Sequence, residues 1–576
     1  MKKRFVLGIL FSVSIIVGTG IKAYHMYANV HHKLDDILSN QDAILQNEQR
    51  EVADTNVTDI VEPTAVREAI DMLNRQNKVD GELKEELKNG EYTFDEPLVV
   101  ENPYAISPLT ALVLFHTDAP CMITLDISGQ TGYDFDDIHV EFDGAGFTTE
   151  HVVPVYGLVP DYQNDVSLKA SYENGDIRET KIQIKTEPLI DDLNKIVHIA
   201  KLTQSEKYEP GFNFSAAGLH HNGIKNAFDS TGKVRWYFNQ AFFATCTNYN
   251  QLDNGHILVK NDSSDLDIIY EMDLLGRIYA IYYDELFSSH HYIELTDHNT
   301  MIVPKLNSEN NQDCLAEIDL STGEMIRFLD YKDIIPRSRN AGAVYDNSDW
   351  MHMNSAVEYQ NDVIVSSNYQ SAIIRNDWDG NIKWILASPE KWYGIWSGKL
   401  LTPIGDEFEW PYNQHAVEVL NDCDDDPYTV DLLMFDNGLS RNYVNNTEEQ
   451  DSYSRLVHYR INEKNMTVEQ IWEYGKEKPE LFSRYRGKAQ ALENGNCLGT
   501  FNQETEAGLP CDTIYVEVDK EKSPVWECYS ASKLQDNAYQ DYQLIRRPLY
   551  REPQYINLEE TVRNFIPKEV LSDFES

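Results

Sequence analysis

Short runs in which apolar and polar residues alternate dominate the chain from about residue 90 onward. Clear examples are residues 111–115, 122–127 and 181–185, and turns rich in Gly, Asn and Asp separate them. A period of two residues is typical of a strand with one buried face. The pattern predicts an all-β protein, and the roughly hundred residues from 91 to 190 suit a β-sandwich.

The segment before this region has a different period. In residues 25–90, Leu34, Ile37, Leu38 and Leu45 recur at helical spacing in a charged background. We expect a helical stalk or linker there, and a helix that dimerises the chain is the alternative.

The first residues have the pattern of an export signal. Lys2, Lys3 and Arg4 precede an apolar run from Phe5 to about Val17. This predicts a signal peptide within residues 1–24, and the longer run through residue 21 leaves an uncleaved membrane anchor as the alternative. Either interpretation predicts an exported protein, extracellular, at the cell surface or in the periplasm.

From about residue 205 the chain repeats a turn followed by a strand that carries tryptophan or another aromatic residue. The turn glycines Gly232, Gly276, Gly323 and Gly380 lie about 44 to 57 residues apart. That interval fits a four-stranded propeller blade, and residues 205–576 are long enough for about six of them. We therefore predict a six-bladed β-propeller over 205–576, with stacked sandwiches as the alternative.

Composition narrows the function classes. Lys and Arg number 49 against 95 Asp and Glu, a formal net charge of −46. Such a field repels nucleic acid and anionic membrane surfaces, so no nucleic-acid partner is expected. No P-loop or G-x-G-x-x-G opens a helix, which argues against a nucleotide cofactor. The cysteines have no C-x-x-C spacing, which argues against zinc, although Cys497 and Cys511 could bridge one hairpin.

Histidines supply the candidate chemistry. The pair His290 and His291, then His352, then His415 each precede an apolar strand in successive repeats. Each alone is more typical of a surface or a hydrogen-bonded core residue. Because equivalent ends of propeller blades converge near the axis, the three positions together predict a shared site, catalytic or metal-binding.

The motifs around these histidines carry a family resemblance. Residues 350–359 and 362–374 resemble the most recognisable stretch of the bacterial PAPS-independent arylsulfate sulfotransferases. Residues 413–416 and the His290–His291 pair fall in the family's order, as do residues 435–438 and 468–477. Residues 102–111 and 157–160 resemble its N-terminal domain, so the resemblance covers nearly everything from about residue 95.

The resemblance implies a six-bladed propeller behind a β-sandwich, with homodimers as a precedent. It implies transfer of a sulfuryl group from an aryl sulfate ester to a phenolic acceptor, without a cofactor, by a ping-pong path through a sulfated histidine. His415 matches that histidine, and His352 and His291 match residues lining the same site. A neutral imidazole is a good nucleophile and a second imidazole a good acid/base. We therefore assign His415 as nucleophile, His352 as acid/base or oxygen donor, and His291 as oxygen donor, with Asn354 as a partner.

One departure from the family pattern affects the site. Family members carry Ser-Ser-Arg where this chain reads Ser366-Ser367-Asn368, and the family's arginine there helps to bind the sulfuryl group. Asn368 can donate hydrogen bonds but carries no charge. Arg484, Arg486 and Lys488 are candidates to supply the missing cation, and we favour Arg486. A propeller that binds sulfated or phenolic ligands without catalysis, and a metal-dependent hydrolase or lyase on the same histidines, are the alternative functions.

Overall fold

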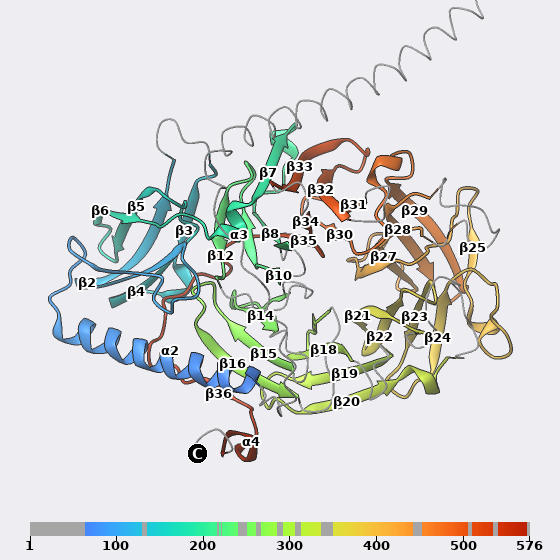
Figure 1. Ribbon diagram of the computed structural model, residues 1–576, viewed down its shortest axis with the longest axis horizontal. Helices are drawn as coiled ribbons and strands as arrows, with labels where there is room; N and C mark the ends of the chain where they lie inside the picture. The colour runs from blue at the N-terminus through green and yellow to red at the C-terminus, as the bar shows by residue number, and fades with distance from the viewer. Residues whose placement is uncertain are drawn as a thin grey trace, which may run out of the picture. The chain divides into compact units, whose positions relative to one another are not determined.

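The computed structural model describes residues 64–129, 135–215, 218–219, 222–239, 250–260, 267–284, 292–305, 313–335, 350–439, 441, 452–504, 510–533 and 539–572 (Figure 1). Apart from Lys533, these residues belong to one compact unit, residues 62–532 with 536–576. Helices are few and strands many, so the all-β prediction is confirmed. The described helices are α2 (Thr64–Asn89), α3 (Asp191–Asn194) and α4 (Lys568–Ser572), and none of them is long and apolar enough to cross a membrane.

The N-terminal sheet is organised around one long strand, β2 (Thr110–Ile127). The first half of β2 pairs with β1 (Leu98–Glu101) and β4 (Thr148–Tyr156). Its second half pairs with β3 (Ile138–Glu141) and β5 (Gln163–Tyr172), and β6 (Ile177–Lys185) extends the sheet beyond β5. The register shifts between His116 and Cys121. A strand that changes partners midway lets the sheet fold over its own core.

Six further sheets of four or five strands follow. In each sheet at least four neighbouring strands pair antiparallel, as in propeller blades, and in two of the sheets a further strand pairs in parallel at one edge. The first three contain β8 (Phe212–Ser215), β11 (Asn226–Phe228), β12 (Val234–Tyr237) and β35 (Leu544–Arg547); β13 (Asn250–Gln251), β14 (Ile257–Lys260), β15 (Asp267–Met272), β16 (Ile278–Asp284) and β36 (Arg563–Asn564); and β17 (Glu294–Leu295), β18 (Thr300–Lys305), β19 (Cys314–Asp319) and β20 (Met325–Asp330).

The other three sheets carry most of the predicted site. They contain β21 (Met353–Tyr359), β22 (Asp362–Ser367), β23 (Ala372–Asn376) and β24 (Ile382–Leu386); β25 (Thr402–Ile404), β26 (His415–Val419), β27 (Thr429–Asp436), β28 (Arg455–Asn462) and β29 (Thr467–Tyr474); and β30 (Lys488–Ala491), β31 (Cys497–Glu504), β32 (Pro510–Val518), β33 (Pro524–Ser532) and β7 (Ile196–Leu202). A small sheet joins β9 (Gly218–Leu219), β10 (Asn222–Gly223) and β34 (Tyr539–Gln540). The propeller architecture is confirmed, and the number of blades stays a prediction.

The repeated turn and aromatic strand seen in the sequence have clear structural roles. Gly232 and Gly276 adopt positive φ angles of 89° and 86°, a region that glycine enters without steric cost. A Cβ at Gly276 would lie 2.7 Å from the Ile106 side chain, so the turn also needs glycine for close packing. Trp236 and Trp384, which follow two of these turns, are almost wholly buried between sheets.

The first and last sheets are tied together by strands from distant parts of the chain. β35, near the C-terminus, pairs with β8 of the first sheet, and β7, from the N-terminal side, pairs with β33 of the last. Each sheet is thus completed by a segment remote in sequence, which closes the array, and Figure 1 shows β35 and β30 near one another.

Buried polar contacts fix the N-terminal region against the propeller. Arg235 of β12 is fully buried, and its Nε donates to the Gly157 carbonyl oxygen at 2.8 Å. The helix α2 falls within the segment predicted as a stalk, and it packs on the same chain. Its Asp80 pairs with Nη2 of Arg277 at 3.0 Å and accepts from the Tyr104 hydroxyl at 2.7 Å.

Among the described residues, five cysteines are free thiols: Cys121, Cys314, Cys423, Cys497 and Cys528. The hairpin bridge between Cys497 and Cys511 is therefore wrong. The register of β31 and β32 explains why, because it places Cys497 opposite Val518, far along the hairpin from Cys511.

Candidate active site

His415 and His352 lie at the corresponding ends of adjoining edge strands. His415 is the first residue of β26, and His352 directly precedes β21. The two strands are in contact, because the Val417 amide donates to Ser355 Oγ at 3.2 Å and Asn354 Nδ2 donates to the Gln414 carbonyl oxygen at 2.7 Å. The predicted His290 and His291 lie outside the described residues.

The orientation of His415 is set by one hydrogen bond. Its Nδ1 lies 2.7 Å from Asn437 Oδ1. Asn437 Nδ2 is already committed, because it donates to the carbonyl oxygens of Ser483 at 2.9 Å and Arg486 at 2.7 Å. The amide is therefore oriented with its oxygen toward the ring, so His415 Nδ1 must be the donor. In the neutral ring this leaves the Nε2 lone pair unprotonated, which is the form that a nucleophile needs.

The surroundings of His415 favour its neutral form. The side chain is 4% exposed. The pKa of His415 is lowered from 6.5 to about 4, mainly by burial; the charges of His352 and Arg486 also lower it, and hydrogen bonds with Asn437 and Asn413 partly oppose this. A positive charge on the ring is disfavoured both by lost hydration and by neighbouring cations. The imidazole is therefore neutral, with its single proton on Nδ1, across the neutral pH range.

His352 differs from His415 in its burial and in its backbone conformation. It is half-buried, its φ is 45°, and its ring stacks on Tyr369 with centroids 4.4 Å apart. A positive φ in a non-glycine residue is uncommon and is held here by the surroundings. The His352 carbonyl oxygen accepts from the Asn368 amide at 3.1 Å. This more accessible imidazole, close enough to influence the charge of His415, suits a group that exchanges protons.

The amides around the two histidines join their sheets. Asn368 Nδ2 donates to the Asn413 carbonyl oxygen at 2.9 Å, and Asn413 Nδ2 donates back to Asn368 Oδ1 at 3.3 Å. Gln414 Nε2 reaches Ser366 Oγ, 3.1 Å away, in the neighbouring sheet. The Asn368 side chain, at the position of the family's arginine, is thus used in holding β26 against the adjoining sheet.

The side-chain amide of Asn354 is only partly hydrogen-bonded within the described part of the chain. Its amide nitrogen donates to the Gln414 carbonyl oxygen, but its Oδ1 is buried without a hydrogen-bond partner among the described residues. A register shift in β21 between Met353 and Ser355 places Asn354 at a bulge. Bulges occur often beside active sites, where they redirect a side chain.

Among the candidates for the missing cation, Arg486 acts on His415 directly. Its charge is one of the causes of the lowered His415 pKa, and its carbonyl oxygen holds the amide of Asn437. Its φ of 61° places it in the left-handed region. Lys488 starts β30, and its charge acts on Glu294 and Glu418. Arg484 lies over the Tyr485 ring, 6.0 Å from its centroid.

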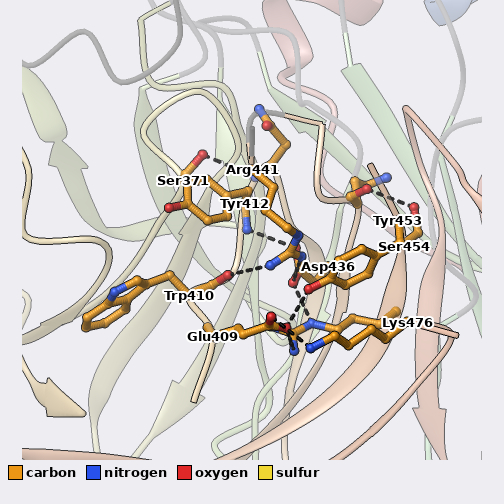
Figure 2. A network of polar contacts seen from close by, with 12 residues as sticks. Ser371, Glu409, Trp410, Tyr412, Asp436, Arg441, Tyr453, Ser454 and Lys476 are labelled. Atoms are coloured by element: carbon orange, nitrogen blue, oxygen red, sulfur yellow. Dashed lines mark hydrogen bonds and ion pairs between the residues drawn. The ribbon is translucent and has the colours of Figure 1, made fainter. Parts of the chain in front are cut away.

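A buried ion-pair network supports the strand that carries Asn437 (Figure 2). Its centre is Asp436, the residue before Asn437, which is fully buried with Arg455. Arg455 Nε pairs with Asp436 Oδ2 at 2.8 Å, and Arg441 Nη2 pairs with the same oxygen at 2.5 Å. Because both cations hold one carboxylate, the backbone at 436–437 has little freedom.

The same network holds the segment that leads into His415. The Tyr412 amide donates to Asp436 Oδ1 at 2.9 Å, and Arg441 Nη1 donates to the Trp410 carbonyl oxygen at 3.1 Å. One residue on, the Asn413 amide donates to Ser371 Oγ at 3.2 Å. The network is completed by Glu409, Tyr453, Tyr459 and Lys476. Sequence reasoning found the motif at 435–438 but no role for Asn437, because the partner is more than 20 residues away and on another strand.

Two groups of described residues could hold a metal ion, and neither includes a predicted site histidine. They are Cys423, Asp431 and His458, and Asp313, Cys314 and Asp330. In the first, Asp431 is already paired with His458 and with the cation Arg460. The described residues therefore give no support for a metal centre built on His352 and His415.

Fold and site together define a propeller protein with a buried, neutral imidazole at the start of an edge strand. A family model described as "Arylsulfotransferase (ASST)" matches residues 198–540, and one described as "Arylsulfotransferase Ig-like domain" matches residues 98–187. The chain belongs to the arylsulfotransferase family and is a sulfotransferase. The family match also confirms a separate Ig-like domain before the propeller.

Individual relatives agree with this assignment. The chain is 24% identical over 489 residues to "Arylsulfate sulfotransferase AssT" of Escherichia coli O6:H1, covering 66% of this chain and 80% of the relative. The AssT of Lelliottia amnigena matches to the same extent, 24% over 489 residues, 66% and 80%. Among solved structures, a virginiamycin B lyase from Staphylococcus aureus gives 12% identity and a TM-score of 0.28, with 71% of this chain and 99% of that chain covered. That TM-score is too low to carry an argument about function.

Proposed function

We propose that this sulfotransferase transfers a sulfuryl group from an aryl sulfate ester to a phenol through a covalent sulfohistidine at His415. The observation that carries the proposal is the fixed tautomer of His415, whose Nδ1 donates to Asn437 and whose Nε2 keeps its lone pair. The lowered pKa of about 4 keeps that lone pair available. The names of the curated relatives, which are arylsulfate sulfotransferases, support the donor class.

The reaction follows a ping-pong order. The Nε2 lone pair of His415 attacks the donor's sulfur, an N–S bond forms, and the S–O bond to the aryl group breaks. The departing phenolate takes a proton from a general acid, and we assign that role to His352. An acceptor phenol then returns a proton to the same imidazole while its oxygen attacks the sulfur. The N–S bond breaks, and its electron pair restores the lone pair of Nε2.

Charge on the sulfuryl oxygens needs nearby donors, because the protein's overall charge is strongly negative. We propose Arg486 for this role, in place of the family's arginine, since its charge acts on His415. We add His291, on the family resemblance, as an oxygen donor. Asn354 is better suited to orienting the start of β21, because its amide nitrogen is already engaged.

The decisive experiment is a single turnover with an aryl sulfate and no acceptor. Intact-protein mass spectrometry should show one added SO₃, released when phenol is supplied, and peptide mapping should place it on His415. His415→Ala should give no adduct, whereas the exposed His139→Ala, on the N-terminal sheet, should label like the wild type. Turnover by His415→Ala at the wild-type rate would refute the proposal. Aryl sulfate binding with neither adduct nor turnover in the wild type would favour the non-catalytic binding module.

Export, N-terminal anchoring and homodimer formation are further proposals. The basic residues before the apolar run Phe5–Val17 support export, and the family precedent supports a dimer. Fractionation of cells that express the full chain, with mass analysis of its N-terminus, tests export and cleavage. Light scattering of the purified protein tests the dimer.

A further inference from the structure

A bulge in β26 brings a carboxylate onto the same face as the nucleophile. Residues three apart on a regular strand point to opposite faces. The register of β26 shifts, however, so that His415 lies opposite Phe435 and Glu418 opposite Leu433. Phe435 and Leu433 are two residues apart and share a face, so their partners His415 and Glu418 share it too. Ala416, with a φ of 52°, is the residue that absorbs the bulge.

Glu418 belongs to an inner charge cluster of Glu294, Glu418, Lys488 and Arg547. The four residues lie on β17, β26, β30 and β35, each an edge strand of a different sheet. Lys488 and Arg547 both act on the charge of Glu294 and of Glu418, which places all four near one another. Two acids and two bases from four sheets thus meet beside the site.

The depth of the cluster follows from the strand contacts. Glu418 Oε2 accepts from the Ala491 amide of β30 at 3.4 Å. On β35, the Arg546 amide donates to Oε1 of Gln490 at 2.8 Å, so the residues next to Arg547 and next to Ala491 are in contact. Phe435 and Leu433, which lie opposite His415 and Glu418 on β27, are two residues apart, so His415 and Glu418 are separated by about 7 Å along the strand direction.

The four charged side chains of the cluster lie near one another but form no ion pairs among the described residues. Within the part of the chain that the structure describes, none of the four residues forms an ion pair within 4 Å, and the buried Nε of Arg547 has no hydrogen-bond partner. Burial raises the pKa of Glu294 to about 7 and also raises that of Glu418, despite Lys488 and Arg547. Glu294, Glu418 and Arg547 keep some exposed surface, so the cluster is not sealed.

Unpaired charges in a poorly hydrated place are costly unless a ligand completes them. The arrangement offers carboxylates to an ammonium group and a guanidinium to a carboxylate, so its complement is a zwitterion. The separation of about 7 Å from the His415 level matches a phenol ring followed by a short carbon chain. A sulfuryl donor or acceptor could therefore reach His415 with its phenolic oxygen while its far end lies among these charges.

We propose that Glu418 and Arg547 bind the amino-acid head of a phenolic substrate, so that the enzyme prefers phenols of the tyrosine type, with free α-ammonium and α-carboxylate groups. The inference rests on the proposed function for its substrate class. Glu418 receives the ammonium group and Arg547 the carboxylate, while Lys488 and Glu294 balance the two charges.

The test compares four acceptors with one aryl sulfate donor: free tyrosine, tyramine, 4-hydroxyphenylpropanoate and 4-methylphenol. For the wild type, kcat/KM should be at least about 10-fold higher for tyrosine than for 4-methylphenol. In Glu418→Gln the advantage of tyrosine and tyramine over 4-methylphenol should fall about 10-fold. In Arg547→Gln the advantage of tyrosine and of the propanoate should fall. Exposed Glu407→Gln and Arg178→Gln are the matched controls and should keep the wild-type ratios.

Each comparison is a ratio within one protein sample, so partial loss of folded enzyme does not affect it. Equal kcat/KM for all four phenols in the wild type, or unchanged ratios in both cluster variants, would overturn the inference and leave the sulfotransferase assignment intact. Phenylalanine, which lacks the reacting hydroxyl, gives an independent measurement by calorimetry. If no phenol were sulfated but phenylalanine bound to the wild type and not to Glu418→Gln, the proposed function would fail and the binding site would stand.

Discussion

Two groups of buried charges flank His415, and two glutamates show how they differ. Glu409 belongs to the buried ion-pair network of Figure 2, where it pairs with Lys476 at 2.9 Å and with Arg455 at 3.2 Å. Burial would raise the pKa of Glu409, but hydrogen bonds from Tyr453 and Lys476 outweigh it and hold that pKa below its ordinary value. Glu418, in the inner charge cluster, forms no ion pair with any residue that the structure describes, and burial leaves its pKa raised.

This difference indicates that the ion-pair network has a structural role and that the inner charge cluster has a binding role. A buried carboxylate that is paired from several sides fixes the backbone around it, and Asp436 does this for Asn437. A buried carboxylate that forms no ion pair with the charged residues described around it can instead bind a charged group of a ligand. The network therefore governs stability and the orientation of His415, whereas the cluster governs what binds beside it.

The largest effect should come from breaking the network at its centre. Asp436→Asn leaves Arg455 and Arg441 buried with a neutral partner, so we expect the free energy of unfolding to fall by about 3–5 kcal/mol. Chemical unfolding followed by tryptophan fluorescence measures this. Loss of less than about 1 kcal/mol would mean that the paired group is not the scaffold inferred here.

The pH dependence of stability should reveal the buried neutral imidazole between the two groups. The pKa of His415 is about 4 in the folded protein against 6.5 when exposed. As pH falls from 6.5 to about 4, the unfolded chain takes up a proton that the folded protein refuses, so stability declines by up to about 3 kcal/mol over that window. Unfolding curves of the wild type and of His415→Gln should diverge between pH 6.5 and 4, with the wild type losing more. Parallel curves would place the imidazole in contact with water.

A third prediction concerns the link from the network to the nucleophile. Asn437→Ala removes the acceptor that fixes His415 Nδ1, so the ring can adopt the wrong tautomer and orientation. We expect kcat for sulfuryl transfer to fall about 100-fold, the size of effect produced by small misplacements of reacting groups. The rate of adduct formation in a single turnover measures it directly. The rate should recover partly in Asn437→Gln only if the amide oxygen itself is what matters.

The smallest effect should be on the stability of the cluster variants. Glu418→Gln removes a charge that has no ion pair within the described part of the chain, so the free energy of unfolding should change by less than about 1 kcal/mol. Glu409→Gln, the matched change in the network, should cost more. If the two variants lose equal stability, the cluster is a second scaffold, and the contrast between the groups disappears.

The sequence predicted the architecture better than the site. Alternation of apolar residues and the regular turn glycines indicated β-sheet repeats, because both depend on local backbone geometry. His352 and His415 could be chosen because each precedes an edge strand of its repeat. The bulge at Ala416, which turns Glu418 toward the face of His415, could not be predicted, since strand register is decided by the partner strand.

The contacts of Asn437 and Asn368 could not be predicted from the sequence for the same reason. Each acts on a residue of another strand, so no local spacing reveals the contact. At Asn368 the motif suggested a weakened anion site, and the structure shows an amide that joins two sheets instead. The charge that acts on His415 comes from Arg486, in a turn whose positive φ has no clear sequence signal apart from the following Gly487.

The closure of the first sheet by β35 has a consequence for biosynthesis. Arg547 ends β35, the last strand added to that sheet, and Tyr542, whose ring centroid lies 6.3 Å from that of His415, precedes this strand by two residues. A growing chain that already contains His352, His415 and Asn437 still lacks the strand that completes the first sheet. His415 thus acquires part of its surroundings only after β27 to β34 have been synthesised, so its environment depends on a segment made much later than its own strand.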